Sequence, residues 1–213
     1  MQIVSDSSIF DKQTFNILGI DPGTDTIGFS IIKVNIDDLK IVSVTPWTEK
    51  VSRFLDENSF EVQIHSAKYS RLRLISEKFS QVLTVYNPTV VASEAPFFNR
   101  LRPNAYAPLV ETVFTLQRAL HLWDDYKPLY MIDPPSVKKA VGAQTRGDKD
   151  AVKKAIKLIK ELEMVNFNNL DACGLRAANH VSRAATSGEG DDDIRLAFFD
   201  HPLIAFRPSR AIH

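Results

Sequence analysis

Residues 17–32 read ILGIDPGTDTIGFSII, and this stretch decides the fold. Its first half belongs to an apolar run over residues 15–20, which stops at the turn signal Asp21-Pro22-Gly23. Its second half resumes with β-branched and aromatic residues over 27–34, a pattern typical of a strand. The stretch therefore predicts a β-hairpin, with Asp21 at the exit of a buried first strand.

The same patterns place the other elements. Three further strands are expected, over residues 41–47, 90–93 and 128–132, the first closing at Pro46 or just after it. Four helices are expected, over residues 65–86, 105–123, 148–162 and 170–185. The order β-β-β-α-β-α-β-α-α predicts an α/β fold: a mixed five-stranded sheet that begins with an antiparallel meander and is flanked by helices.

Length and composition fit one soluble domain. The chain has 213 residues, of which 44% are hydrophobic and 24% charged. We expect an N-terminal extension over residues 1–15, the folded domain over 16–186 and an acidic, mobile tail over 187–213.

The sequence offers no sign of a membrane or secreted protein. We find no membrane-spanning run and no secretory signal, and the single cysteine, Cys173, fits a reducing compartment. A cytoplasmic protein, bacterial or viral, is the expectation, with an organelle still open.

Charge restricts where a nucleic acid could bind. Lys plus Arg and Asp plus Glu are equal, at 26 each, so a DNA-binding surface has to be local. Such a basic stretch runs from Lys138 to Lys160 and contains only two acids, Asp148 and Asp150. It fits a nucleic-acid face, but a Lys-rich helix is also the ordinary solvated face of a soluble protein.

Three acids stand at element ends. Asp21 and Glu94 each follow a buried apolar strand, and Asp171 lies near the start of the last expected helix. Carboxylates that converge above a sheet edge form a site for a divalent cation, and their mutual repulsion requires one. Asp21 could instead shape its turn, and Asp171 could stabilise a helix N-terminus. Glu94 has no obvious structural duty.

Four blocks of the sequence resemble, in order, the motifs of RuvC-type Holliday-junction resolvases, which belong to the RNase H-like superfamily. The blocks are ILGIDPGTDTIGFSII (17–32), ASEAPFF (92–98), SVKKAVGAQTRGDKDAV (136–152) and LDACGLRAANH (170–180). The resemblance implies an RNase H-like nuclease that cuts four-way DNA junctions as a homodimer. The helix over 105–123 is a plausible surface for pairing.

The resemblance also implies the site residues. Asp21, Glu94 and Asp171 would bind one or two Mg²⁺ or Mn²⁺ ions, and Lys149 would assist catalysis. The family usually has an acid or histidine three residues before the last aspartate, where this chain has Asn168, an uncharged ligand. Contacts with branched DNA are expected from Phe97, Arg100, Arg102, Lys138, Lys139, Arg146 and Lys149.

Simpler interpretations and different functions stay open at this point. Phe97 and Phe98 would more often be core residues, and Arg100 and Arg102 could be plain solvated arginines. The IDPGTDTIG segment also resembles the phosphate-binding hairpin of actin-type ATP-binding proteins. The chain could also be a non-cleaving DNA-binding module, or a nuclease that cuts flaps, forks or structured RNA.

Overall fold

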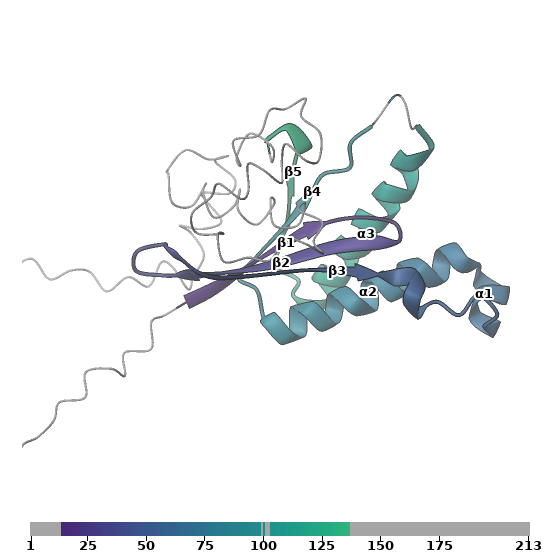
Figure 1. Cartoon of the computed structure of the whole chain (residues 1–213), viewed down its shortest axis with the longest axis horizontal. Helices are drawn as coiled ribbons and strands as arrows, with labels where there is room; N and C mark the ends of the chain where they lie inside the picture. Colours follow the sequence, from purple (N-terminus) through teal and green to yellow (C-terminus); the bar gives the residue numbers. More distant parts are fainter. Residues whose placement is uncertain (1–13, 99, 101–102, 137–213) are drawn as a thin grey trace, which may run out of the picture.

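The computed structural model of the chain describes residues 14–98, 100 and 103–136 (Figure 1). The helices expected over 148–162 and 170–185 and the expected C-terminal tail lie outside these residues. The first strand begins at Thr14, slightly before the expected start of the domain, because Phe15 pairs with Val34 and is buried.

Five strands form one mixed sheet within the described residues, in the order β3-β2-β1-β4-β5. β2 pairs antiparallel with both β1 and β3, whereas β4 is parallel to β1 and β5 is parallel to β4. The strands are β1 (Thr14–Asp21), β2 (Thr26–Asn35), β3 (Ile41–Lys50), β4 (Val90–Glu94) and β5 (Leu129–Ile132). The expected antiparallel meander and mixed five-stranded sheet are confirmed.

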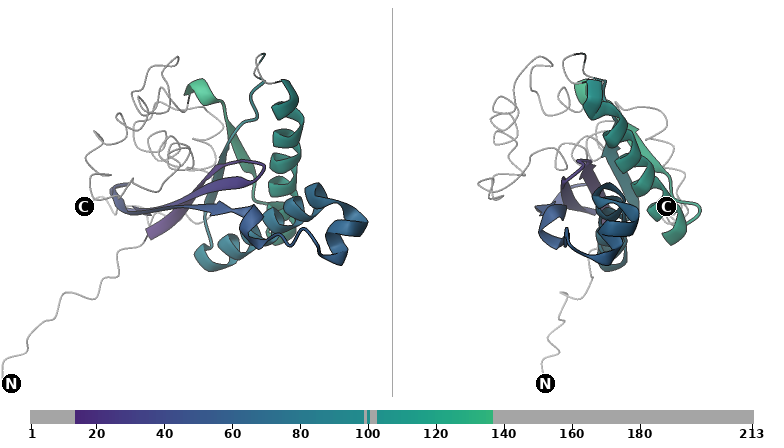
Figure 2. Two further views of the ribbon diagram at one scale, coloured as in Figure 1. Left: turned by 45° about the vertical axis from the view of Figure 1, so that its right-hand side comes forward. Right: turned by 90° about the vertical axis from the view of Figure 1, so that its right-hand side faces the viewer.

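Two long helices, α2 (Ala67–Tyr86) and α3 (Tyr106–Trp123), lie on one face of this sheet (Figures 1 and 2). Phe79 of α2 and Leu116 of α3 belong to the same buried cluster as Leu18 of β1, which fixes that face. The shorter pieces are α1 (Phe60–His65) and two 3₁₀ turns, η1 (Val51–Phe54) and η2 (Pro103–Ala105).

The third strand is longer than the sequence predicted. β3 runs to Lys50 and passes through Pro46, which pairs with Ser30. Because β3 is an edge strand and pairs with β2 alone among the described strands, it tolerates a residue without an N–H group. A proline on an edge strand also hinders pairing with another chain.

The helix predicted over 65–86 begins at Ala67, and a short helix that the sequence did not predict, α1, precedes it and ends at His65. Ser66 has φ 82° and ψ 153°, and its hydroxyl accepts a hydrogen bond from Tyr69 N at 3.4 Å, which caps α2. Ser59 caps α1 in the same way, accepting from Val62 N at 3.3 Å. Serine is a preferred N-cap because its oxygen satisfies a free N–H of the first turn.

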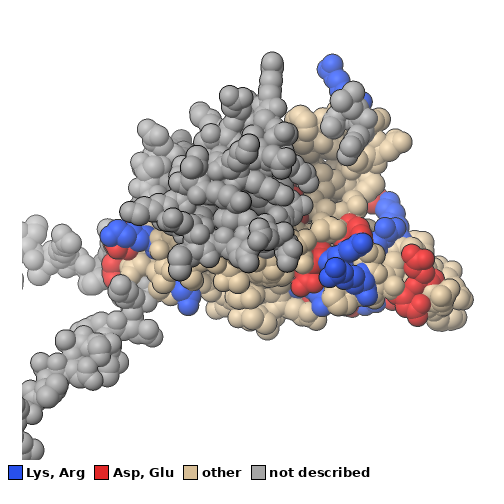
Figure 3. Space-filling model, in the orientation of Figure 1, with Lys and Arg blue, Asp and Glu red and all other residues tan. Residues whose placement is uncertain are grey.

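Charged side chains of the described residues gather toward the end of the molecule that carries α1, with both signs interspersed (Figure 3). Arg73 of α2 bonds both Glu61 of α1 and Glu77, one helical turn away. The hydrogen bond from Arg73 lowers the pKa of Glu61. The Arg73–Glu61 pair joins α1 to α2, whereas Arg73–Glu77 lies within α2, and as largely solvent-accessible pairs both contribute little stability.

Alternation along the strands divides the buried core into two layers. Even-numbered Leu18 and Ile20 of β1 face α2 and α3, whereas odd-numbered Ile17 belongs to the layer on the opposite face. That second layer contains Phe15, Ile17, Ile32, Val34, Val90, Ala92 and Ile132. Each strand of the centre is therefore apolar on both faces, as a buried mixed sheet requires.

The entry of the chain into β4 is fixed beside β1. Asn16 Nδ2 donates to the Tyr86 carbonyl at 2.6 Å, and the Asn16 carbonyl accepts from Thr89 N at 2.8 Å. Between these bonds Asn87 adopts the left-handed conformation, with φ 40° and ψ 60°, which ends α2 and turns the chain. The register of β4 against β1 is thus set at its first residue, where Val90 pairs with Ile17.

The stability of the helical layer can be tested at Phe79. Its ring is fully buried and lies parallel to that of Phe29, with the two centroids 6.3 Å apart. Phe79→Ala should lower the free energy of unfolding by about 3–5 kcal/mol, measured by urea denaturation, because it leaves a cavity. Phe60→Ala, at a ring that is 77% exposed, should change it by less than about 0.5 kcal/mol. Equal losses in the two variants would contradict the assigned core.

Candidate active site

Two acids lie level with each other at the carboxyl ends of neighbouring parallel strands. Asp21 is the last residue of β1 and Glu94 is the last of β4. The register pairs Ile20 with Ser93, so Asp21 and Glu94 come next on adjacent strands, whose axes lie about 4.8 Å apart. Both residues are half-buried. The structure thus brings together the two described acids that the sequence singled out.

The face of the sheet that carries these acids follows from alternation. Asp21 is in phase with Ile17 and Glu94 with Ala92, which belong to the layer opposite α2 and α3. Their neighbours on that face are small: Gly28 pairs with Asp21, and Ala92 pairs with Gly19. The acids therefore occupy the end of the face with small side chains, and the bulkier Ile17 and Ile32 lie farther from them.

The turn that follows Asp21 is held tightly. A Cβ atom on Gly23 would lie 2.0 Å from the carbonyl oxygen of Thr26, so only glycine fits there. The Asp25 carboxylate accepts from Ser52 N at 2.9 Å and from Ser52 Oγ at 3.2 Å. The Asp25 carbonyl accepts from Val51 N at 2.7 Å. Sequence reasoning missed Asp25, although a short polar residue in a turn is itself a signal for such bonds.

The segment after Glu94 exposes aromatic rings. Phe97 is 60% and Phe98 52% exposed, so the interpretation of both as core residues is wrong. Phe98 makes an edge contact with Tyr106, at 5.7 Å between ring centroids, and Arg100 is exposed. An aromatic and basic surface therefore begins a few residues beyond one of the acids.

Another carboxylate stands near this edge. Asp133 follows β5, whose last residue, Ile132, pairs with Glu94. Its carboxylate accepts from Ser136 N at 2.9 Å, which caps the turn at Pro134 and Pro135. Asp133 therefore has a structural role that its Asp-Pro-Pro context already signalled.

The other expected site residues are outside the described part of the chain. These are Arg102, Lys138, Lys139, Arg146, Lys149, Asn168 and Asp171. Among the residues that the structure describes, no three or more His, Cys, Asp or Glu side chains form a group that could hold a metal ion. Nor does any helix in the described ranges have the length and apolarity needed to cross a membrane.

The chemistry of the acid pair follows from its geometry. Two half-buried carboxylates on adjacent strands repel each other, and the repulsion is relieved by a cation that both can bind. Hard divalent cations prefer carboxylate oxygen ligands. Asp21 and Glu94 can therefore contribute two ligands to a divalent metal centre at the sheet edge.

A family model and individual relatives both connect this chain with the same protein family. The family model described as crossover junction endodeoxyribonuclease RuvC matches residues 17–175. Of the relatives with that name, the protein of Dehalococcoides mccartyi is 27% identical over 180 residues, which cover 82% of this chain and 98% of the relative. That of Christiangramia forsetii is 32% identical over 96 residues, which cover 45% of this chain and 43% of the relative.

Solved structures support the fold. The structure described as T. thermophilus RuvC in complex with Holliday junction substrate matches with a TM-score of 0.61 at 21% identity. The match covers 82% of this chain and 96% of that one. The yeast mitochondrial Holliday junction resolvase matches with a TM-score of 0.50 at 17% identity, covering 80% and 76%. The expected RNase H-like fold is confirmed.

Divalent-ion binding should be visible as thermal stabilisation. We expect Mn²⁺ to raise the melting temperature of the wild type, since a ligand at 100 times its Kd stabilises by about 2.7 kcal/mol. Asp21→Asn should remove most of this gain, because it replaces a charged carboxylate ligand with a neutral amide. Differential scanning fluorimetry measures both effects.

The control is Asp37→Asn, which removes an exposed acid from the turn between β2 and β3. It should keep the wild-type response to Mn²⁺. An equal Mn²⁺ response in Asp21→Asn and wild type would rule out Asp21 as a ligand.

Proposed function

Because the chain belongs to the RuvC family of crossover junction endodeoxyribonucleases, we propose that Asp21 and Glu94 are catalytic acids of its nuclease site. Membership makes the protein a DNA endonuclease, a hydrolase of phosphodiester bonds at crossover junctions. The observation that carries the residue assignment is the β1–β4 register, which puts the two acids side by side at one sheet edge.

The donor set of this edge suits a divalent cation. Asp21 and Glu94 would hold it together with Asp171, and Asn168 would add an uncharged oxygen ligand. One or two Mg²⁺ or Mn²⁺ ions, when bound, supply electrostatic stabilisation of the charge that develops on the cleaved phosphodiester. The part of the acids is to fix the ion position, since both stand on strands held by backbone hydrogen bonds on either side. Lys149 would stabilise charge on the same phosphodiester.

The substrate proposed is a four-way DNA junction. Exposed Phe97 would contact the bases near the crossover, and exposed Arg100 would contact backbone phosphate. Further phosphate contacts are assigned to Arg102, Lys138, Lys139, Arg146 and Lys149. Since the chain has no net charge, these contacts must be concentrated on one surface. Selectivity would come from the shape of the junction rather than from base edges.

A homodimer is part of the proposal, with α3 as the pairing surface. Val110 and Phe114 lie one helical turn apart on the outer side of α3 and are 38% and 66% exposed. Phe114 is large and apolar and faces away from α2 and the sheet. A closed two-fold interface would cover its exposed ring. Two copies related by a two-fold axis would present two sites to opposite strands of a junction.

Because the proposed substrate is DNA, we infer a cytoplasmic location, in a bacterium or in a cell infected by a virus. An organelle that maintains its own DNA is the alternative location.

Cleavage of a labelled synthetic four-way junction in Mg²⁺ or Mn²⁺ tests the function. Wild type should give paired, symmetric nicks, read on denaturing gels. Asp21→Asn and Glu94→Gln should each lower the rate by about a thousandfold, since a catalytic metal contributes several kcal/mol to the barrier and 1.36 kcal/mol is tenfold. Glu49→Gln makes the same change in a half-buried acid of β3 and should cleave normally.

Two outcomes would contradict junction resolution. Equal or faster cleavage of flaps or forks would make the protein a nuclease for other branched DNA. Binding of the junction without cleavage in both metals would make it a non-cleaving DNA-binding module.

The dimer is tested at Phe114. Phe114→Glu should convert a dimer into a monomer in sedimentation velocity, because it places a charge in the centre of the proposed contact. Paired nicks should then become single, uncoordinated ones. Val85→Glu introduces the same charge at a 73% exposed apolar residue of α2 and should remain dimeric. A Phe114→Glu protein that sediments like wild type would remove α3 from the interface.

A further inference from the structure

A hollow of about 270 Å³ lies between the turn after Asp21 and the first turns of α2 and α3. Its walls are Thr24 from the turn, Lys68, Arg71 and Leu72 from α2, and Pro108, Glu111 and Thr112 from α3. None of these residues is among the DNA contacts assigned above. The hollow lies at the same edge of the sheet as the acids but on the side of α2 and α3. Thr24 follows Asp21 by three residues, and a chain of that length spans at most about 10 Å.

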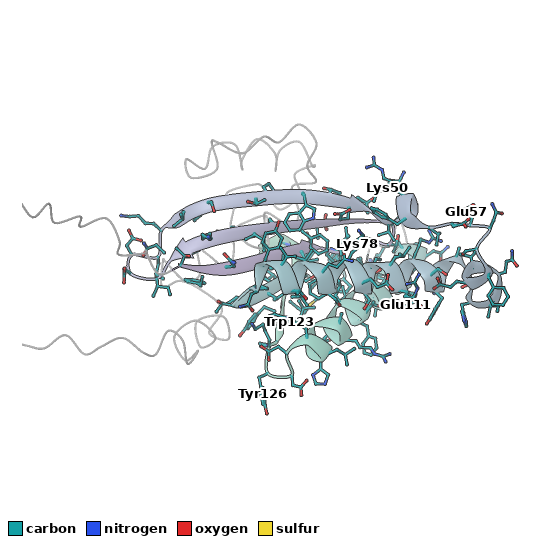
Figure 4. All side chains as sticks on the ribbon, turned by 90° about the horizontal axis from the view of Figure 1, so that it is seen from below. Lys50, Glu57, Lys78, Glu111, Trp123 and Tyr126 are labelled. Carbon is teal, nitrogen blue, oxygen red and sulfur yellow. The ribbon has the colours of Figure 1, made fainter. Side chains whose placement is uncertain are left out.

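The charges in the hollow leave one cation uncompensated. Lys68 Nζ lies 2.7 Å from each carboxylate oxygen of Glu111, which is on α3 where that helix passes α2 (Figure 4). This pair is neutral in sum. Arg71 donates from Nε to the Ala67 carbonyl at 3.3 Å and forms no ion pair with any residue in the described ranges. Among the described residues the hollow therefore carries one net positive charge, on a guanidinium whose two Nη groups make no hydrogen bond to them.

The contrast with Arg73 is informative. Arg73 lies two residues farther along α2 and is bonded by both Glu61 and Glu77. Its bonds with these acids raise its pKa, as expected for a guanidinium in an ion-pair network. The two arginines of α2 thus differ in their ion pairs. Arg73 joins α1 to α2, and Arg71 offers its charge to the hollow.

The walls of the hollow are fixed before any ligand arrives. Gly23 and the bonds between Asp25 and Ser52 hold the turn that carries Thr24. The Lys68–Glu111 pair joins α2 to α3, and Thr112 is buried with its hydroxyl bonded to the Pro108 carbonyl at 3.0 Å. Pre-organised walls lower the entropy cost of binding.

We propose that this hollow binds a backbone phosphate of the DNA strand that runs from Asp21 and Glu94 around the same sheet edge, with Arg71 as the cation and Thr24 as a hydroxyl donor. The inference rests on the proposed function. A phosphodiester carries one negative charge, which matches the net charge of the hollow, and a guanidinium can bind two of its oxygens at once. One strand of DNA presents a phosphate about every 3.4 Å along the axis, so the hollow is within a few nucleotides of the cleaved bond. The contact would position the strand without reading its sequence.

The salt dependence of junction binding tests the proposal. Fluorescence anisotropy of a labelled four-way junction in EDTA, which prevents cleavage, gives Kd over a series of salt concentrations. Arg71→Gln should weaken binding about tenfold at moderate salt, as expected for loss of a charge-assisted bond. The slope of log K against log salt should fall in magnitude by about 0.9, the value for one phosphate contact.

Lys33→Gln is the matched control, since it also removes one positive charge. Lys33 is exposed on β2 at the end of the sheet remote from Asp21, and should keep the wild-type Kd and slope. Thr24→Val tests the wall of the hollow opposite Arg71 and changes no residue of the helices. It should weaken junction binding by a smaller factor than Arg71→Gln and leave the slope of log K against log salt unchanged. All variants are compared after their melting temperatures have been measured.

The binding measurements distinguish failure of the phosphate site from failure of the proposed function. If Arg71→Gln keeps the wild-type slope and Kd, or if Lys33→Gln loses as much as Arg71→Gln, the phosphate site is overturned while junction cleavage by the wild type stands. If Arg71→Gln does not fold, an unchanged Kd in Thr24→Val overturns the site and a raised one supports it. If the wild type neither binds nor cleaves the junction, the proposed function and the phosphate site fail together.

Discussion

Parallel hydrogen bonding between β1 and β4 is the constraint on which the rest of this structure depends. It joins segments far apart in the sequence and pairs Ile20 with Ser93, so that Asp21 and Glu94 are at equivalent positions on adjacent strands. A slip of one residue would move Glu94 to the opposite face, because side chains alternate along a strand. The slip is prevented at the other end of β4 by the bonds of Asn16 to Tyr86 and Thr89. The acid pair is therefore positioned by bonds a whole strand length away from it.

The acid pair is close to segments of the chain that are held rigidly and to a cation, Arg71, that forms no ion pair with the described residues. The turn after Asp21 is fixed by Gly23 and by the bonds of Asp25, and the helices behind it are joined by Lys68 and Glu111. Five ion pairs join charged side chains of the described residues, whereas several described cations, such as Lys33, Lys50 and Arg118, form none with them. A DNA-binding protein of this composition needs particular unpaired cations, and Arg71 is one of them in the described residues. Family membership also removes the reason for an ATP-binding function, since the Asp-Pro-Gly hairpin is accounted for by a nuclease.

Most of the described fold could be predicted because local patterns and the global fold agree. The Asp-Pro-Gly turn between two apolar runs predicted the hairpin, and spacings of three and four predicted the positions of α2 and α3. The errors came where tertiary context overrides local preference. Pro46 continues β3 because an edge strand leaves one side free. Ser66 caps α2 with its hydroxyl and separates it from α1, a helix that the sequence did not predict. Phe97 and Phe98 are exposed, although aromatic residues are more often buried.

By itself, the sequence determined the element order, the two acids at strand ends and the resemblance to a nuclease family, because strand ends and turns are local features of a chain. Only the tertiary structure decided that Asp21 and Glu94 are neighbours on one face, since strand order and register depend on pairing between distant segments. The same holds for Arg71 and Arg73, which the sequence presents as two similar arginines on one helix. Glu77 lies four residues from Arg73 on the same helix, but Glu61 reaches Arg73 only because the fold packs α1 beside α2, whereas Arg71 forms no ion pair with a described acid.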